Sequence, residues 1–377
     1  ELCGIAWSLP LLVAARAVQG LGAGATLPMS MTIVGDIYTL AERARVQGYL
    51  ASVWAISSVV GPLLGGVFSQ LGIWRGVFLI NIPLCLLAAW MFSRHFHEKV
   101  THRHRNVDIL GAALLACAMT ALILAVLGGG QTWTWSSVPS ISAFAGGAAL
   151  LMAFVVVERR APEPVLPLWV FSRRLLCATT IVAFGVGAIL MGLTSYVPTF
   201  LEGSLRTKPV IAGLALAALT LGWPATASVS GRFYLRWGFK NTAVLGATLV
   251  IAGSAVLVTV AHRPNVAVVA TACLVIGSGM GLLAVPTLIA AQSSIDWNER
   301  GVVTGNNMFA RSLGSAVGVA VFGAIANSIF GPGDVHSVGP AAIKAGSAAV
   351  FIGVLIVAAA TAVAVLAMPR TPPQSGQ

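Results

Sequence analysis

The chain has 377 residues, of which 57% are hydrophobic and only 9% charged, and its mean hydropathy is +0.90. This composition excludes an ordinary water-soluble protein, because so few charges cannot solvate a globular surface. The net charge of +11 comes from basic residues scattered over several links, which fits contact with anionic lipid and disfavours nucleic acid as a partner.

In chain order, apolar stretches long enough to cross a bilayer core, which takes about 20 residues, follow one another along the sequence. Short links rich in glycine, proline, tryptophan or charge separate them, as expected at a membrane surface. The sequence therefore predicts an all-α polytopic membrane protein with eleven membrane helices in this chain. The predicted spans are residues 11–34, 46–69, 75–93, 108–128, 137–157, 175–200, 209–230, 241–261, 266–291, 301–329 and 345–367.

Lysine and arginine fall mainly in alternate links. With residues 35–45 in the cytoplasm, fifteen of the 22 basic residues lie on the cytoplasmic side and five outside, while Arg16 and Arg311 lie within spans. This bias matches the positive-inside rule and predicts a multi-pass protein of the cytoplasmic membrane, in contact with the lipid bilayer.

An internal repeat relates residues 20–66 to 277–323 without a gap. The pair Glu42-Arg43 aligns with Glu299-Arg300, and internal repeats of helix bundles are a common way to build transporters. Compared with the second half, the first lacks roughly 80 residues, or about three membrane helices, so we expect an N-terminally truncated chain and about fourteen helices in the complete protein. The aligned glycines are Gly20, Gly22, Gly24, Gly48, Gly61 and Gly66 with Gly277, Gly279, Gly281, Gly305, Gly318 and Gly323.

The repeat and the links together predict the domain organisation. We expect the remainder of an N-terminal helix bundle at 1–93, a basic cytoplasmic linker at 94–107 and a two-helix insert at 108–158. A second cytoplasmic linker at 159–174 leads to a C-terminal six-helix bundle at 175–368 and a cytoplasmic tail at 369–377.

Arg311 lies eleven residues after Arg300, or about 16 Å along a helix, which places it near the middle of the membrane. A lone cation is costly there and usually faces a cavity. Asn307 lies one turn earlier on the same face. Two interpretations stay open: these residues line a polar cavity, or they form a structural hydrogen-bond cluster that caps neighbouring carbonyls.

The acidic residues fall at predicted helix ends, where we expect most of them to be solvated or paired with arginines of the links. The five cysteines are isolated, so we expect them to be packing residues. The histidines between His95 and His104 indicate a solvated linker, and we expect no metal site and no cofactor. The acids considered are Asp36, Glu42, Asp108, Glu202, Asp296 and Glu299.

The segment Arg16-Ala-Val-Gln19-Gly20 is similar to the signature of the fourth helix in the drug:proton antiporters of the major facilitator superfamily. A run of small residues in 48–66 resembles their fifth-helix antiporter motif. Three further segments resemble the fourteen-helix branch, namely Asn81-Ile-Pro83, Asp108-x-x-Gly111 and the segment that begins at Arg311. The residues matching the antiporter motif are Gly48, Ser57, Gly61, Pro62, Gly65 and Gly66.

The family's loop motif is similar to residues 231–240, with Gly231, Arg236 and Gly238 in place. Leu235 stands where the family has an aspartate, so this copy lacks the acid to which the conformational latch is usually assigned.

The resemblance implies a two-bundle helical carrier that exports lipophilic or cationic drug-like compounds by alternating access. The proton gradient would be its energy source, protons and small lipophilic or cationic molecules its ligands, and a monomer its expected state. Arg16 and Asp36 would take part in coupling, and the antiporter motif would control a helix bend and bundle contact. The proton carrier would be an acid upstream of Glu1 or one of the acids named above, with Asp36 the best candidate present. The candidate cavity residues are Gln19, Asn81, Asn307 and Arg311.

Alternatives remain for these roles. Arg16 could simply extend to the interface from a helix end, and the glycines could serve close packing, although Pro62 favours a bend. The chain could carry another substrate, such as a lipid, a siderophore or a small solute, or be a non-transporting truncated remnant. A membrane-embedded enzyme is disfavoured, because no hydrolase motif is present.

Overall fold

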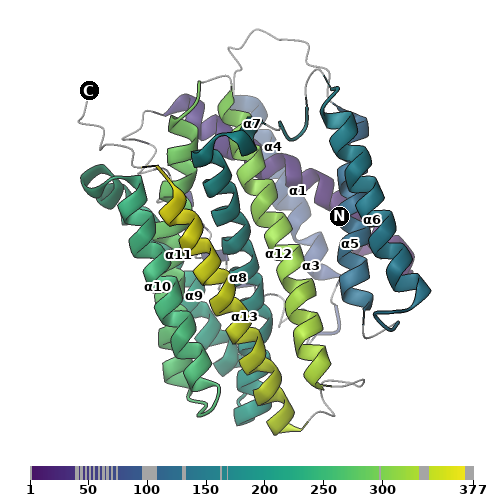
Figure 1. Cartoon of the computed structure of the whole chain (residues 1–377), viewed down its shortest axis with the longest axis vertical. Coiled ribbons are helices and arrows are strands. Elements are labelled where there is room, and N and C mark those ends of the chain that lie inside the picture. Colours follow the sequence, from purple (N-terminus) through teal and green to yellow (C-terminus); the bar gives the residue numbers. More distant parts are fainter. Residues whose placement is uncertain are drawn as a thin grey trace. The chain divides into compact units, whose positions relative to one another are not determined.

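A computed structural model describes residues 2–38, scattered residues between 42 and 73, and residues 75–95, 108–129, 133–161, 164–167, 169–296, 299–330 and 339–369. Apart from one isolated bridge between Gly129 and Trp133, the regular structure in this part of the chain is helical (Figure 1). The elements are η1 (Leu2–Ile5), α1 (Leu9–Ile37), α3 (Gly76–Leu79), α4 (Asn81–His95), α5 (Ile109–Gly128), α6 (Val138–Glu158), α7 (Trp169–Ser172), α8 (Arg174–Leu205), α9 (Pro209–Trp237), α10 (Phe239–Val260), α11 (Val266–Ser293), α12 (Arg300–Phe330) and α13 (Pro340–Ala367).

The chain divides into two compact units. The first comprises residues 1–39 and 53–105, and the second comprises residues 40–52 and 106–377. In the first unit η1 packs on α1 and α3, and the Arg75 guanidinium donates to the Ala6 carbonyl at 3.1 Å. Cys3, Ala6 and Ala15 are buried, whereas the described side chains of α4 are mostly exposed.

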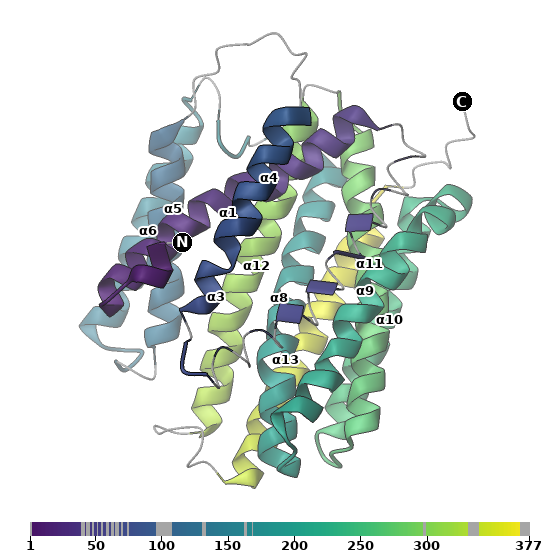
Figure 2. The ribbon, with the colours of Figure 1, turned by 180° about the vertical axis from the view of Figure 1, so that it is seen from behind.

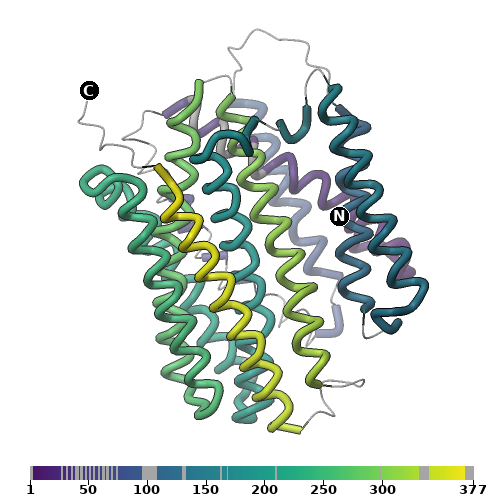
Figure 3. Tube along the Cα trace, viewed as in Figure 1, coloured from purple at the N-terminus to yellow at the C-terminus, as the bar shows by residue number. Residues whose placement is uncertain are grey.

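The second unit contains the helices α5 to α13. Helix α8 packs against α9, α11, α12 and α13, and Figure 2 shows it among these helices. The side chains buried between the helices of α8 to α13 form the main hydrophobic core, in which Phe200 and Phe351 meet edge to face at 5.4 Å. Helices α5 and α6 form a hairpin, and α5 also packs on α12 (Figure 3).

Local sequence signals set several helix ends. Asn265 caps α11, because its Oδ1 accepts from the backbone N–H groups of Ala267 at 2.9 Å and Val268 at 3.2 Å. Proline lies in the first turn of α6, α9 and α13, where no helical hydrogen bond is lost. Gly238 alone joins α9 to α10 with a φ of 81°, a left-handed conformation that favours glycine.

Nine helices among the described residues are long and apolar enough to cross a membrane. They coincide with the nine predicted spans from 75–93 to 345–367, which confirms the all-α, multi-pass prediction for this part. Helix α1 covers the predicted span 11–34, whereas most of 46–69 lies outside the described residues.

Three predicted span boundaries differ from the described helices by five residues or more. Helix α8 continues to Leu205, α9 continues to Trp237, and α13 already begins at Pro340. The predicted loop motif therefore begins on the last two turns of α9. Apolar character ends at the membrane surface, but a helix can continue into water because its backbone hydrogen bonds are internal.

Candidate functional site

The centre of α12 carries the candidate site of the second unit. The Arg311 guanidinium carbon lies 5.7 Å from the ring centroid of Trp223 on α9, and both side chains are half-buried. Arg311 makes no hydrogen bond or ion pair with any other side chain that the structure describes. An aromatic face is a favourable neighbour for a desolvated guanidinium. The pair therefore joins α9 and α12, which do not otherwise pack closely on each other.

The backbone beneath Arg311 is fixed against α8. A Cβ at Gly187 would overlap the Arg311 carbonyl oxygen, and a Cβ at Gly314 would overlap the Phe184 carbonyl oxygen. The Ser315 hydroxyl donates to the carbonyls of Arg311 at 3.1 Å or Gly187 at 3.2 Å. Because glycines let the two backbones touch, the position of Arg311 is set by a close helix contact.

The backbone beneath Trp223 is fixed in the same way against α11. A Cβ at Gly281 would overlap the Trp223 carbonyl oxygen, and the Thr226 hydroxyl donates to the Ser278 carbonyl at 2.7 Å. Gly277 likewise lies against the backbone of Leu219. Thus Arg311 lies on a helix that packs tightly on α8, and Trp223 lies on a helix that packs tightly on α11.

Asn306 and Asn307 are buried next to Arg311 along α12 but bind α8. The Asn306 amide donates to the Thr180 hydroxyl at 2.7 Å, and the Asn307 amide donates to the Thr179 carbonyl at 3.4 Å. Asn307 thus contacts a carbonyl of α8, whereas Arg311 extends toward α9. Of the two asparagines, Asn306 keeps a buried Oδ1 without a hydrogen-bond partner.

In the first unit, the structure brings Arg16 and Gln19 together. The Arg16 Nη1 donates to Gln19 Oε1 at 3.0 Å, and the Cys3 thiol lies 3.5 Å from the same oxygen. Both Arg16 and Gln19 are exposed within their unit. Asn81 begins α4, where its amide donates to the Val77 carbonyl at 3.1 Å.

Most of the predicted antiporter motif lies outside the described residues. Ser57 and Gly61 are helical and exposed, and a Cβ at Gly61 would meet no atom within 4 Å. The backbone of Asp36 belongs to α1, but its side chain lies outside the described part, as does His97. The predicted roles of this segment therefore stay predictions. The motif residues outside the described part are Gly48, Pro62, Gly65 and Gly66.

The residues of the predicted latch surround the joint between α9 and α10. Gly231 is buried within α9, Arg236 is exposed in its last turn, and the Gly238 N–H donates to the Tyr234 carbonyl at 2.9 Å. Lys240, which follows, donates from Nζ to the carbonyls of Leu366 and Met368 at 2.6 Å each. Sequence reasoning missed this contact with the end of α13.

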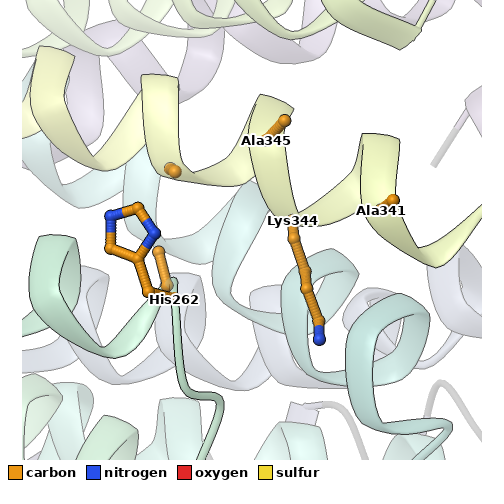
Figure 4. Close-up of a pocket in the computed structure, with 6 residues that line it drawn as sticks. His262, Ala341, Lys344 and Ala345 are labelled. Carbon is orange, nitrogen blue, oxygen red and sulfur yellow. The ribbon is translucent and has the colours of Figure 1, made fainter.

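A pocket lies between the end of α10 and the beginning of α13. Figure 4 shows His262 after α10 and Lys344, Ala341 and Ala345 on α13 around it. It contains none of the predicted site residues. No group of three potential metal ligands occurs among the described residues.

Comparisons with known proteins place these features in a family. The sequence profile of the Major Facilitator Superfamily matches residues 2–319. Multidrug resistance protein 3 of Bacillus subtilis is 32% identical over 331 residues, which are 87% of this chain and 64% of that protein. Multidrug transporter protein MdtP of the same organism is 30% identical over 328 residues, 87% of this chain and 60% of that protein.

The chain thus spans less than two thirds of the length of these relatives. Among solved structures, the nucleoside transporter NupG matches with a TM-score of 0.48 and 16% identity, covering 90% of this chain and 86% of that one.

Proposed function

Because the chain belongs to the Major Facilitator Superfamily, a family of carriers rather than enzymes, we propose that it exports lipophilic or cationic drug-like compounds in exchange for protons. Two relatives that are multidrug proteins by name support the substrate class. Alternating access between two helix bundles would move the substrate across the membrane. A proton gradient, with no bound cofactor, would supply the energy.

The observation that carries the proposal is the pair of Arg311 and Trp223. A cation near the middle of the membrane with no described acid beside it is costly, and such residues usually serve a substrate or ion path. The indole offers an apolar face to a lipophilic ligand. Because Arg311 is positive, it would contact an aromatic or hydrogen-bond-accepting part of the substrate rather than a cationic group.

Arg16, which is exposed and donates to Gln19, is our candidate for coupling in the first unit. Arg16 would hold a carboxylate in its charged form until substrate binding separates the two groups. The partner of Arg16 would be an acid on another helix, because Asp36 lies about 30 Å further along α1. Asp36 remains our candidate for the proton carrier. Gly61 and the neighbouring motif residues would control the bend and bundle contact, and Gln19 and Asn81 would line the substrate path.

The test is export of a fluorescent lipophilic dye from proteoliposomes driven by a pH gradient. Arg311→Ala removes the cation–π contact, which is worth about 0.5–2 kcal/mol, so dye export should fall about 2- to 30-fold. Arg263→Ala removes an exposed arginine that lies just beyond α10 and serves as the matched control. Dye export that is equally fast in both variants and in the wild type would refute the assigned role of Arg311.

Proton coupling needs its own measurement. Addition of substrate should dissipate the pH gradient across the membrane of vesicles that contain the wild-type protein. Substrate transport with no accompanying proton flux would mean that the protein is a carrier with another coupling mode. That result would refute proton antiport but not the proposed substrate class.

A further inference from the structure

Two acidic side chains close one end of the hairpin formed by α5 and α6. Asp108 caps α5, and its Oδ1 accepts from the Gly111 N–H at 2.8 Å. Glu158 ends α6, is only 3% exposed, and accepts from the Leu166 N–H through Oε1 at 2.5 Å. Each carboxylate therefore uses one oxygen to bind a backbone amide.

The second oxygen of each carboxylate lies beside Gly111. Asp108 Oδ2 and Glu158 Oε2 are both buried, and neither has a hydrogen-bond partner. A Cβ at Gly111 would lie 3.2 Å from Glu158 Oε2 and closer still to Asp108 Oδ2. The two orphan acceptors thus lie beside the same glycine, which carries no side chain.

This arrangement is unfavourable when both groups are ionised. Two carboxylates at short range repel, and a buried acceptor without a donor loses the hydrogen bond that it would make with water. One proton between Oδ2 and Oε2 removes the repulsion and satisfies both acceptors through a single O–H···O hydrogen bond. Binding of one proton is the simplest change that corrects both defects.

No described basic group neutralises the pair instead. Helix α5 packs on α6 and α12, and the structure gives no hydrogen bond or ion pair between the two carboxylates and any charged side chain that it describes. Residues 96–107 and Glu163 lie outside the described part. The ionisable groups of the elements around the pair are Cys117 on α5, exposed Arg159 and Arg160 after α6, and Arg300 and Arg311 on α12.

We propose that Asp108 and Glu158 together bind one proton, and that this proton joins the adjacent ends of α5 and α6. The proton comes from water at this end of the hairpin and returns there, so no other reactant is needed. Loss of the proton leaves two repelling carboxylates and loosens the hairpin end. This site is separate from Arg311 and Trp223 and does not depend on the proposed transport activity.

The direct test is infrared spectroscopy of the purified protein in lipid nanodiscs. The wild type should show the C=O stretch of a protonated carboxyl at neutral pH, which disappears as the pH rises. Glu158→Gln and Asp108→Asn should each remove this band, whereas Glu202→Gln, at an exposed acid near the end of α8, should leave it unchanged. A wild-type protein without the band, or a band that survives both substitutions, would overturn the proposal.

Thermal unfolding gives a second readout. If the folded pair holds a proton that the unfolded chain releases, stability falls as the pH rises through loss of that proton. Glu158→Gln should remove this pH dependence, because the amide donates a hydrogen bond at every pH. A wild-type melting temperature that instead depends on added sodium or magnesium would identify a metal-cation site and contradict the shared proton.

Gly111→Ala tests the geometry without removing either acid. The added methyl group should displace the Asp108 carboxylate and abolish the band, whereas Gly146→Ala, where a Cβ would meet no atom within 4 Å, should retain it. Retention of the band in Gly111→Ala would overturn the shared position of the two oxygens. If Gly111→Ala does not fold, the two amide substitutions still decide the question.

Discussion

Replacement of Gly187 by alanine should destabilise the second unit by forcing α8 and α12 apart. The new Cβ would overlap the carbonyl oxygen of Arg311, which is backbone and cannot rotate away. Helix α12 would have to shift, and the guanidinium of Arg311 would move relative to the ring of Trp223, now 5.7 Å away. The same single methyl group should therefore affect stability and the candidate site together.

The magnitude follows from two opposing terms. Overpacking of a close contact costs about 1–3 kcal/mol, and backbone overlap favours the upper part of that range. Replacement of a helical glycine by alanine returns about 0.5–1 kcal/mol. Gly213→Ala on α9 gains the second term without the first, because a Cβ there would meet no atom within 4 Å. The difference between the two variants should thus be about 1–3 kcal/mol.

The measurement is the midpoint of thermal unfolding for both variants in the same detergent. At about 2–4 °C per kcal/mol, Gly187→Ala should melt about 2–12 °C below Gly213→Ala. Equal midpoints would refute the reasoning, since they would mean that α8 and α12 can separate at no cost. A larger shift in Gly213→Ala would contradict the assignment of open space around that residue.

The remaining predictions concern polar contacts between helices and use the same unfolding assay. Lys240→Met removes two charge-assisted hydrogen bonds to the end of α13 and should cost about 2 kcal/mol. Arg236→Met, at an exposed position nearby, is its control and should leave the midpoint unchanged. Thr226→Val removes the bond to the Ser278 carbonyl and should cost about 0.5–1 kcal/mol. The control is Thr248→Val, because the exposed Thr248 hydroxyl bonds only within its own helix, and this variant should change the midpoint less. An equal loss of stability in both variants would contradict a role of the Ser278 contact.

The sequence predicted the helices well because each span has to satisfy its backbone hydrogen bonds internally and cover them with apolar side chains. That requirement produces a long hydrophobic segment in the sequence, which can be recognised without knowing which helices pack beside it. Helix ends are less visible, as Trp237 shows, because a helix that leaves the bilayer no longer needs apolar residues.

Contacts between helices were only partly predictable. Helical spacing placed Asn307 and Arg311 on one face of α12, but it could not tell that Asn307 contacts α8 and Arg311 contacts α9. Trp223 was missed because its role depends on how two helices distant in sequence approach each other.

Glu158 was missed for a different reason. A charged residue at the end of an apolar run resembles an ordinary boundary residue, and its burial depends on the return of the chain at Leu166. Asp108, which we expected to be solvated or paired with an arginine, instead has a buried oxygen beside Gly111. The Asp-x-x-Gly spacing was a usable signal, since a capping acid followed by a glycine leaves room for a second group.

The contact of Lys240 with α13 has a practical consequence for handling the protein. Both acceptor carbonyls lie within residues 366–368, so the ammonium group needs the polypeptide to continue at least to Met368. A purification tag or fluorescent reporter attached beyond Met368 keeps both acceptors in the native end of α13, whereas a truncation before Leu366 removes them. The useful attachment point for a probe on this side of the bundle is therefore defined to within a few residues.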